Sequence, residues 1–304
     1  MPFNGLPEKM PAPIACSRIM ARTVNFMGNS TRRAMIGAAM VFALAACSGD
    51  APEKDATTAP TFVSLNPCID AILVEVAAPE QILALSHYSR DPSASSMEVA
   101  RAEEFGVTGG TVEEILALEP DIVLGSTFMA PATRNALDQL GLRVESFGSP
   151  ATAGESVEQV RALAALTGNT KAGEALVERI EASPAAAGVG QISALLWQPG
   201  QIVPGQNTLV AEHIRAAGFA DYAAERGLAQ ADYIALEQIL SDPPDLLLVA
   251  GNSAGQRHPI LAGALPSMRV AEYYPSLLYC GGPPIRAARE RLKALHDSME
   301  RNLP

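Results

Sequence analysis

Three side chains in this sequence could form a catalytic triad. Gly251-Asn-Ser-Ala-Gly255 matches the G-x-S-x-G pattern of a nucleophilic serine on a sharp turn, and Glu272 and His296 follow it as acid and base. Pro259, however, lies six residues after Ser253, where the helix that follows such a turn should continue. Only 51 residues follow the serine, too few for the rest of a hydrolase sheet. We therefore expect no enzyme and no catalytic residues, and an exported serine esterase using Ser253 is kept as an alternative.

The histidines are the side chains that could bind a metal ion directly. The chain has four, His87, His213, His258 and His296. A site for a bare transition metal needs three or four ligands that converge on one point. Only His87 and His258 fall in loops that could line a cleft, whereas His213 and His296 fall within predicted helices. We expect no metal-ligating residues, and a binder of a bare transition metal is a second alternative.

Residues 1–46 have the features of a signal peptide for export. Arg32-Arg33 precedes an apolar stretch of 13 residues, Ala34 to Ala46, which is too short to span a bilayer. Leu44-Ala45-Ala46-Cys47 resembles a lipobox, which predicts a lipidated Cys47 as the first mature residue and a tether over 47–60. The alternative is ordinary signal-peptidase cleavage that releases a soluble protein. Translation could also start at Met27.

The two remaining cysteines of the mature chain form a candidate pair. Cys16 precedes the export segment and Cys47 is the lipidation candidate, which leaves Cys68 and Cys280. Exported proteins fold in an oxidising compartment, where an even number of cysteines favours disulfides. The pair could instead be two separate buried thiols, since a bridge requires Cα atoms within about 7 Å.

Composition excludes several classes of protein. The 304 residues are 48% apolar and 18% charged, which provides a core and argues against a disordered chain. The net charge is −11, but the residues from Cys47 onward hold 17 basic and 32 acidic side chains and carry −15. A body this acidic repels phosphate backbones, so we expect no nucleic-acid partner. Aromatic residues make up only 5%, with a single tryptophan.

Short apolar runs alternate with helical patterns from Thr61 onward, as in α/β units with parallel sheets. The pattern predicts strands over 62–65, 82–86, 122–126, 143–147, 193–197, 246–250 and 276–280, and helices over 70–77, 111–118, 130–140, 209–217, 236–240 and 285–302. Helical periodicity also covers 152–182, with a break at Gly168-Asn169. We therefore predict an N-terminal lobe over 61–150, connecting helices over 151–183, and a C-terminal lobe over 184–304 that ends in an amphipathic helix.

One segment occurs twice. Val112–Leu124 aligns with Leu236–Leu248 at a shift of 124 residues, and the glutamate, proline and aspartate of the two copies coincide. Each copy reads as a short helix, a Pro-Asp stop and a buried strand. The repeat predicts two similar lobes, although such a helix-to-strand junction is also common in unrelated α/β proteins.

From Thr61 to Leu303 the chain resembles the helical-backbone periplasmic binding proteins, the cobalamin and iron-chelate receptors of bacterial ABC importers. The likeness rests on Phe62–Leu73, Ile82–Ser89, Val107–Ile115 and Leu236–Ile239, in that order. It implies two α/β lobes with mostly parallel sheets, joined by a helical backbone, with a ligand cleft between them and limited lobe closure. It also implies a monomer that captures a metal chelate (a corrinoid, a ferric siderophore or heme) for a permease and ATPase complex. No cofactor is expected besides the cobalt or iron of the ligand itself.

Loops at the carboxyl ends of parallel strands are where ligands collect in such folds. The predicted cleft residues are Asn66, Pro67, Cys68, His87, Tyr88, Ser89, Gly109, Gly110, Phe128, Trp197 and Asn252. The resemblance places Tyr88 against the corrin ring, and Trp197 could face it across the cleft. Trp197 could equally be a core residue, and Asn66-Pro67 could simply begin a helix. The family's tryptophan near Gly109 is missing here, so the ligand is not identified by the resemblance.

The resemblance also assigns one transporter-docking acid to each lobe. These acids fall on Glu113 and Glu237, the glutamates that coincide in the repeated segment. Two carboxylates could bind two arginine-lined pockets of a two-fold symmetric permease. The alternative is that each glutamate only offsets the dipole of its own helix.

Overall fold

The first half of the chain forms a five-stranded parallel sheet with strand order β3-β2-β1-β4-β5. The computed structural model describes residues 59–188, 190–262 and 267–301, so the predicted signal peptide, Cys47 and most of the tether lie outside the described residues. The elements of this half are β1 (Phe62–Ser64), α2 (Pro67–Val76), η1 (Pro79–Gln81), β2 (Ile82–Ser86), η2 (His87–Arg90), α3 (Val99–Ala102), β3 (Val107–Thr108), α4 (Val112–Leu118), β4 (Ile122–Ser126), α5 (Pro131–Gln139) and β5 (Arg143–Phe147).

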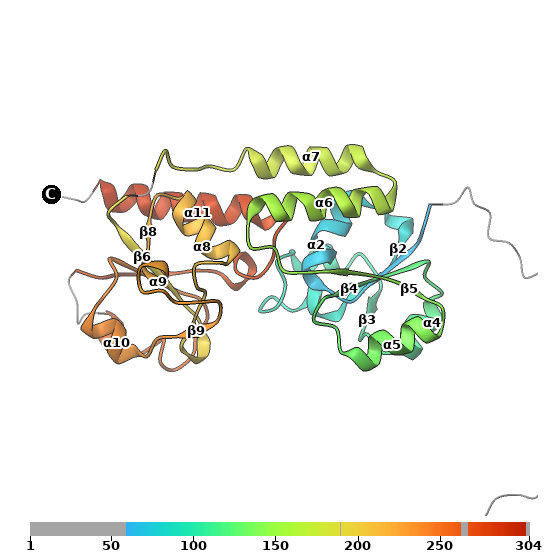
Figure 1. Ribbon diagram of the computed structural model, residues 1–304, viewed down its shortest axis with the longest axis horizontal. Helices are drawn as coiled ribbons and strands as arrows, with labels where there is room; N and C mark the ends of the chain where they lie inside the picture. Colours follow the sequence, from blue (N-terminus) through green and yellow to red (C-terminus); the bar gives the residue numbers. More distant parts are fainter. Residues whose placement is uncertain (1–58, 189, 263–266, 302–304) are drawn as a thin grey trace, which may run out of the picture. The chain divides into compact units, whose positions relative to one another are not determined.

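Two antiparallel helices connect the halves. Helix α6 (Ala153–Thr167) begins at Thr152, whose hydroxyl accepts from the Glu155 N–H, and it ends at Gly168, where φ is +77°. Helix α7 (Thr170–Glu181) starts two residues later and lies along α6 (Figure 1). A positive φ suits glycine and stops the helix, so the predicted break at Gly168-Asn169 is confirmed.

The second half forms a four-stranded parallel sheet, β11-β10-β6-β8, and a two-stranded antiparallel pair, β7-β9. Its elements are β6 (Ser193–Trp197), η3 (Pro199–Gln201), β7 (Ile202–Val203), α8 (Leu209–Ala216), β8 (Ala220–Asp221), α9 (Tyr222–Glu225), β9 (Asp232–Tyr233), α10 (Leu236–Ser241), β10 (Leu246–Val249), η4 (Pro259–Ala262), β11 (Arg269–Glu272), η5 (Pro275–Leu277) and α11 (Pro284–Glu300).

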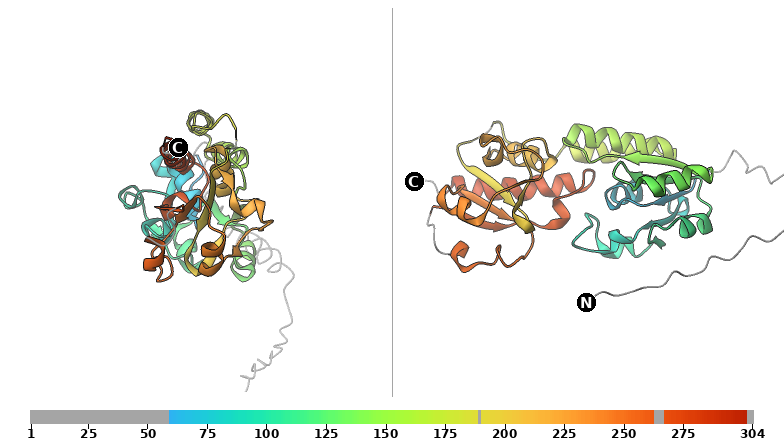
Figure 2. Two further views of the ribbon diagram at one scale, coloured as in Figure 1. Left: turned by 90° about the vertical axis from the view of Figure 1, so that its left-hand side faces the viewer. Right: turned by 60° about the horizontal axis from the view of Figure 1, so that its bottom comes forward.

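Helix α11 packs against one face of the second sheet. Leu292 and Leu295 pack into a core cluster with the strand residues Leu246 and Leu248, and the helix runs beside the sheet in each view (Figure 2). The first core cluster contains α2, α6 and α7 residues together with Ile285 of α11, so one apolar core joins the connecting helices to both halves. Among the described residues, no helix has the length and apolarity needed to cross a membrane.

The predicted strand over 276–280 is wrong. Pro275 begins a 3₁₀ turn there, and Tyr279 and Cys280 continue as irregular chain. The last strand is instead Arg269–Glu272, an edge strand whose residues are mostly exposed. An edge strand of this kind lacks the apolar run that marks a buried parallel strand, so its sequence signal is weak.

Candidate ligand-binding site

Loops after four strands of the first sheet surround a cavity of about 500 Å³. The lining residues are Leu65, Ser86, His87, Tyr88, Thr108, Gly109, Gly110, Ser126, Phe128, Met129, Ala130 and Thr133. The loops meet because parallel strands all end at the same edge of a sheet. Of the eleven predicted cleft residues, the structure brings five together here, namely His87, Tyr88, Gly109, Gly110 and Phe128.

Three aromatic side chains stand around this cavity. The His87 and Tyr88 rings lie 4.0 Å apart between centroids, at 36° to each other. Tyr88 is 50% exposed and Phe128 79% exposed, although large aromatic side chains are normally covered. These rings offer apolar faces to a ligand with a flat surface.

The cavity lining has little charge. Neither Lys, Arg, Asp nor Glu is among the described residues that line it. Glu114 lies beside the rim, where its carboxylate accepts from the Thr108 hydroxyl at 2.8 Å and from the Gly109 N–H at 2.7 Å. The Thr108 hydrogen bond lowers the pKa of Glu114 below its ordinary value. The Glu114 carboxylate is therefore engaged by hydrogen bonds from the loop residues Thr108 and Gly109. The cavity lining itself presents aromatic rings, hydroxyls and backbone groups.

A second groove of about 330 Å³ lies where the chain after the first sheet meets loops of the second half. It is lined by Ser149, Pro150, Ala151, Gln198, Ile202, Pro204, Asn207, Thr208, Leu209, Val210, Gln230, Ala231, Leu278 and Tyr279. This lining also contains no acid or base within the described residues, but it offers three carboxamides, from Gln198, Asn207 and Gln230. Carboxamides can both donate and accept hydrogen bonds.

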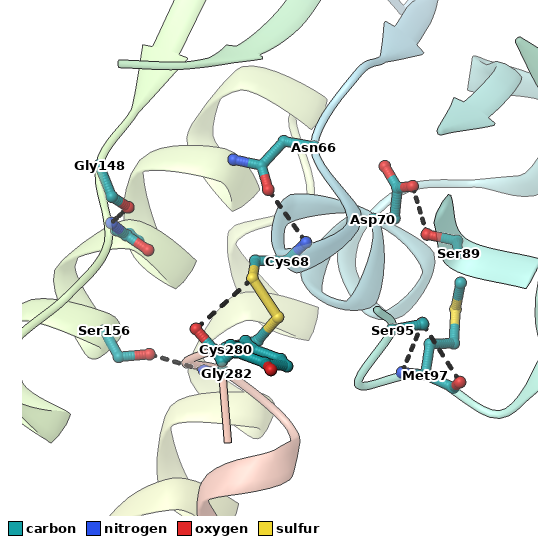
Figure 3. The surroundings of a disulfide bond; sticks show 12 residues. Asn66, Cys68, Asp70, Ser89, Ser95, Met97, Gly148, Ser156, Cys280 and Gly282 are labelled. Carbon is teal, nitrogen blue, oxygen red and sulfur yellow. Dashed lines mark hydrogen bonds between the residues drawn. A yellow bond between two sulfur atoms is a disulfide. The ribbon is translucent and has the colours of Figure 1, made fainter. Parts of the chain in front are cut away.

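Asn66, Pro67 and Cys68 begin α2 and are not among the residues that line either cavity. The Asn66 side chain accepts from the Cys68 N–H at 3.0 Å, and Pro67 occupies the first helical position. Cys68 forms a disulfide with Cys280, with their Cα atoms 5.0 Å apart (Figure 3). The helix-start interpretation therefore describes Asn66-Pro67, and Cys68 joins the first sheet's helix to the segment that leads into α11.

Ser89 does not face the ligand cavity. Its side chain is fully buried, and its hydroxyl donates to the Asp70 carboxylate at 2.6 Å. The prediction failed because Ser89 is the third residue of the 3₁₀ turn η2, which directs Tyr88 outward and Ser89 toward α2. Asp70, which carries no predicted role, is fully buried, and burial raises its pKa to about 7 against the opposing hydrogen bonds of Ser89 and Ser86. An acid inside the apolar run Ile69–Leu73 was the available sequence signal.

Trp197 is a core residue, so the prediction that it faces a ligand is wrong. Its side chain is 2% exposed and its indole N–H donates to the Ile234 carbonyl at 3.0 Å. It ends the inner strand β6, where alternate side chains enter the two faces of the sheet, and it packs there with Leu247 and Ile239. Position after a strand did not reveal which way the ring points.

The candidate serine and histidine of a hydrolase triad make other contacts in the structure. Asn252 is exposed and lines neither cavity. The Ser253 hydroxyl is bonded to the Gln256 side-chain oxygen at 3.0 Å, and the buried His296 ring packs edge-on against Phe219 at 4.8 Å. Among the residues that the structure describes, no histidine is a hydrogen-bond partner of Ser253, which contradicts the esterase alternative.

The structure also places the potential metal ligands. Within the described ranges, one group of three such side chains occurs, His296, Asp297 and Glu300 on α11, and Asp297 is paired with Lys293 at 2.8 Å. None of them lines the cavity beside His87. His258 accepts from the Ile260 N–H through its own ring nitrogen.

Glu113 and Glu237 occupy the same position at the N-termini of α4 and α10. The side chain of the next residue in each helix bonds to backbone that precedes the helix. Glu114 accepts from the Gly109 N–H at 2.7 Å, and Gln238 accepts from the Ala235 N–H at 2.8 Å. Glu113 and Glu237 themselves are exposed and have no hydrogen bond or ion pair with any described residue. The repeat thus presents one unpaired carboxylate from each half.

Comparison with known proteins identifies the class of this fold. Residues 62–261 match the periplasmic binding protein family. The chain belongs to this family. The predicted resemblance is confirmed, as is the predicted α/β class with two lobes. A comparison with curated protein sequences gives no match.

Solved structures with the same fold include three receptors. The vitamin B12 binding protein BtuF of Vibrio cholerae has a TM-score of 0.59 and 18% identity, covering 80% of this chain and 99% of that one. The heme binding protein HutB of Vibrio cholerae gives 0.63 and 19%, covering 78% and 98%. The heme-binding protein RhuT from Roseiflexus sp. RS-1 gives 0.62 and 21%, covering 79% and 99%.

Family membership supports a periplasmic substrate-binding role in ABC import. Family members are transport binding proteins rather than enzymes.

Proposed function

We propose that this protein captures a planar metal chelate of the corrinoid type and delivers it to the permease of an ABC importer. The observation that carries the proposal is the cavity on the first sheet, where three aromatic rings, one of them the His87 imidazole, surround a lining without Lys, Arg, Asp or Glu among the described residues. A macrocycle can lay its face on Tyr88 and Phe128, whose exposed rings otherwise contact water.

The neutral lining distinguishes the chelates that the family resemblance left open. A ferric siderophore of the catecholate type is strongly anionic, and heme carries two carboxylates. Both need basic partners, because an anion taken out of water without a counter-charge is costly. A corrinoid ring carries carboxamides instead, and these can pair with Gln198, Asn207 and Gln230 in the second groove.

Heme is the second candidate, and one observation favours it. His87 and Tyr88 stand next to each other at the cavity, and imidazole and phenolate are both axial ligands of heme iron. An axial bond could offset part of the cost of the two unpaired carboxylates.

The export segment and Cys47 complete the proposal. A lipidated Cys47 would hold the protein at a membrane surface while residues 47–60 act as a tether. Glu113 and Glu237 would then bind the permease, one from each lobe.

The test is titration of the purified mature protein with dicyanocobinamide, cyanocobalamin, hemin, ferrichrome and ferric enterobactin, followed by visible absorbance and calorimetry. We expect one equivalent of corrinoid to bind with a Kd in the micromolar range or below, and ferric enterobactin not to bind. Saturable hemin binding with a shifted Soret band, and no corrinoid binding, selects heme. Binding of none of the five compounds refutes the chelate proposal.

A further inference from the structure

Asp70 links helix α2 to the turn that carries the cavity's aromatic pair. Its Oδ2 atom accepts from the Ser86 N–H at 2.9 Å and from the Ser89 hydroxyl at 2.6 Å. Ser86 and Ser89 flank His87 and Tyr88 on both sides. Figure 3 shows the Asp70 side chain reaching from α2 toward Ser89.

The helix end of this link is rigid. Asn66 caps α2 at its first turn, and Cys68 is tied to Cys280, both within four residues of Asp70. The neighbouring residues Ile69, Ile72 and Leu73 lie in the first core cluster. Asp70 therefore projects from a helix that is capped, cross-linked and packed into the core.

The other end of the link is short and exposed. Turn η2 covers only His87–Arg90, and the His87, Tyr88 and Arg90 side chains are exposed. Besides its bonds to Asp70, the turn has three outside contacts among the described residues: Ser86 caps it by accepting from the Tyr88 N–H at 3.3 Å, the His87 Nδ1 lies 3.3 Å from the Thr108 carbonyl oxygen, and Arg90 donates to the Phe105 carbonyl at 2.8 Å. Short 3₁₀ turns have poor internal hydrogen bonds, so outside contacts decide their position.

Stability alone does not account for an acid at this position. The Oδ1 atom of Asp70 is buried and has no hydrogen-bond partner within the described residues. A buried polar atom without a partner is costly, and such groups call for a specific explanation. The explanation available here is the pair of bonds that Oδ2 makes to the two sides of the Tyr88 turn.

We infer that Asp70 is a positioning residue for ligand binding, which acts by holding the turn His87–Arg90 so that the Tyr88 ring faces the cavity. Its effect on a ligand passes through Tyr88. The inference rests on the proposed function in one respect, that Tyr88 contacts the ligand. The positioning itself is a property of the unliganded protein.

The ligand-independent test is amide hydrogen exchange of the purified mature protein over residues 86–91. Asp70→Ala removes the acceptor and should raise exchange in this segment by about tenfold, an effect worth roughly 1.4 kcal/mol. Asp70→Asn keeps a carbonyl oxygen in place of Oδ2 and should stay within about threefold of the wild type. Asp245→Ala is the matched control, because Asp245 also accepts from a backbone N–H and a serine hydroxyl, but in the other half. It should leave the segment unchanged.

The ligand-dependent test is a double-mutant cycle with dicyanocobinamide. Asp70→Ala should weaken binding about tenfold in the wild-type background, and less than about twofold in a Tyr88→Ala background. Asp70→Asn should restore the affinity. An equal loss in both backgrounds, or no rise in exchange over 86–91, overturns the inference.

Ser89→Ala covers the case in which Asp70→Ala does not fold. It removes one of the two donors to Oδ2 without removing the acid, and it should raise exchange over 86–91 as well. If the wild type binds no chelate, the proposed function fails, while the exchange experiment still decides whether Asp70 holds the turn.

Discussion

Asp121 and Asp245 make the same pair of hydrogen bonds in the two halves of the chain. Asp121 accepts from the N–H and the hydroxyl of Thr61, and Asp245 accepts from the N–H and the hydroxyl of Ser193, all at 2.8 Å. In each half the aspartate precedes one strand and fastens it to the start of its parallel neighbour. The segment that occurs twice in the sequence therefore forms the same strand-to-strand hydrogen bonds in each half, as expected for two related lobes.

We expect Asp121→Ala to lower the free energy of unfolding by about 1–3 kcal/mol, because it removes the acceptor of two hydrogen bonds. Asp245→Ala should cost less, since Asp245 is exposed whereas Asp121 is half-buried. Both joins lie at the amino ends of the strands, away from the cavity, so neither change should alter chelate affinity. Urea denaturation and ligand titration check this. An equal cost of both variants, or a loss of affinity, contradicts it.

We expect Tyr88→Ala and Phe128→Ala each to weaken chelate binding by about tenfold, because each removes an aromatic face from the cavity. Thermal stability should hardly change, since both side chains are largely exposed. Tyr274→Ala is the matched control, because Tyr274 is 48% exposed, like Tyr88 at 50%, but does not line the cavity. Calorimetric titration of the three variants measures the effect. A comparable loss in Tyr274→Ala would rule out a specific role of the rings.

The buried Asp70 should make stability depend on pH. Its folded pKa of about 7 lies above the unfolded value of about 3.9, so the folded state holds the extra proton between these two values. Stability from this group is therefore complete below pH 4, falls as the pH rises to about 7, and stays reduced above it. Asp70→Asn removes the charge and should flatten this fall, so that the variant is more stable than the wild type at pH 8 and similar at pH 4. Denaturant titrations from pH 4 to 8 test the prediction, and parallel curves for both proteins would contradict it.

Much of the fold could be predicted from local patterns. Strands β2, β4 and β6 have the predicted ends, and the connecting helices break where predicted, because buried parallel strands are apolar runs and glycine stops helices. The edge strand Arg269–Glu272 was missed because half of its residues are charged. This strand can be identified only in the folded structure, where it pairs with β10.

The ligand-binding site was predictable only in part, because some of its features depend on tertiary packing. Tyr88 and Phe128 follow strand ends, and that position is visible in the sequence. Trp197 also ends a strand, but its ring enters the core because of how β6 lies between its neighbours. Asp70 and Ser89 are 19 residues apart, and only the packing of α2 on the turn brings them together. Contacts of this kind depend on tertiary packing, which no local pattern contains.

Removing the Cys68–Cys280 disulfide should destabilise the protein. The bond closes a loop across a sequence separation of 212 residues, for which the chain-entropy description gives about 5.4 kcal/mol as an upper value. We expect the double variant Cys68→Ser with Cys280→Ser to melt at a lower temperature than the oxidised wild type. Reductant should lower the melting temperature of the wild type and leave that of the double variant unchanged. If reductant does not change the melting temperature of the wild type, the two sulfurs are not bonded in solution.

Replacing both exposed glutamates should separate transport from ligand capture. Glu113 and Glu237 are unpaired, sit on equivalent helices and do not line the cavity, so Glu113→Gln with Glu237→Gln should leave chelate affinity unchanged while removing the charges that a permease could bind. Uptake of labelled corrinoid by cells that depend on this protein should then fall by more than about tenfold, since charged hydrogen bonds at an interface are worth about 1.5–3 kcal/mol each.

Glu80→Gln with Glu178→Gln is the control for net charge, because it removes two exposed acids outside α4 and α10. Uptake by this control should equal that of the wild type. If the two pairs reduce uptake equally, the effect comes from overall charge and the docking assignment is wrong. If the Glu113 and Glu237 pair instead weakens chelate binding by the purified protein, these residues act on the ligand rather than on the transporter.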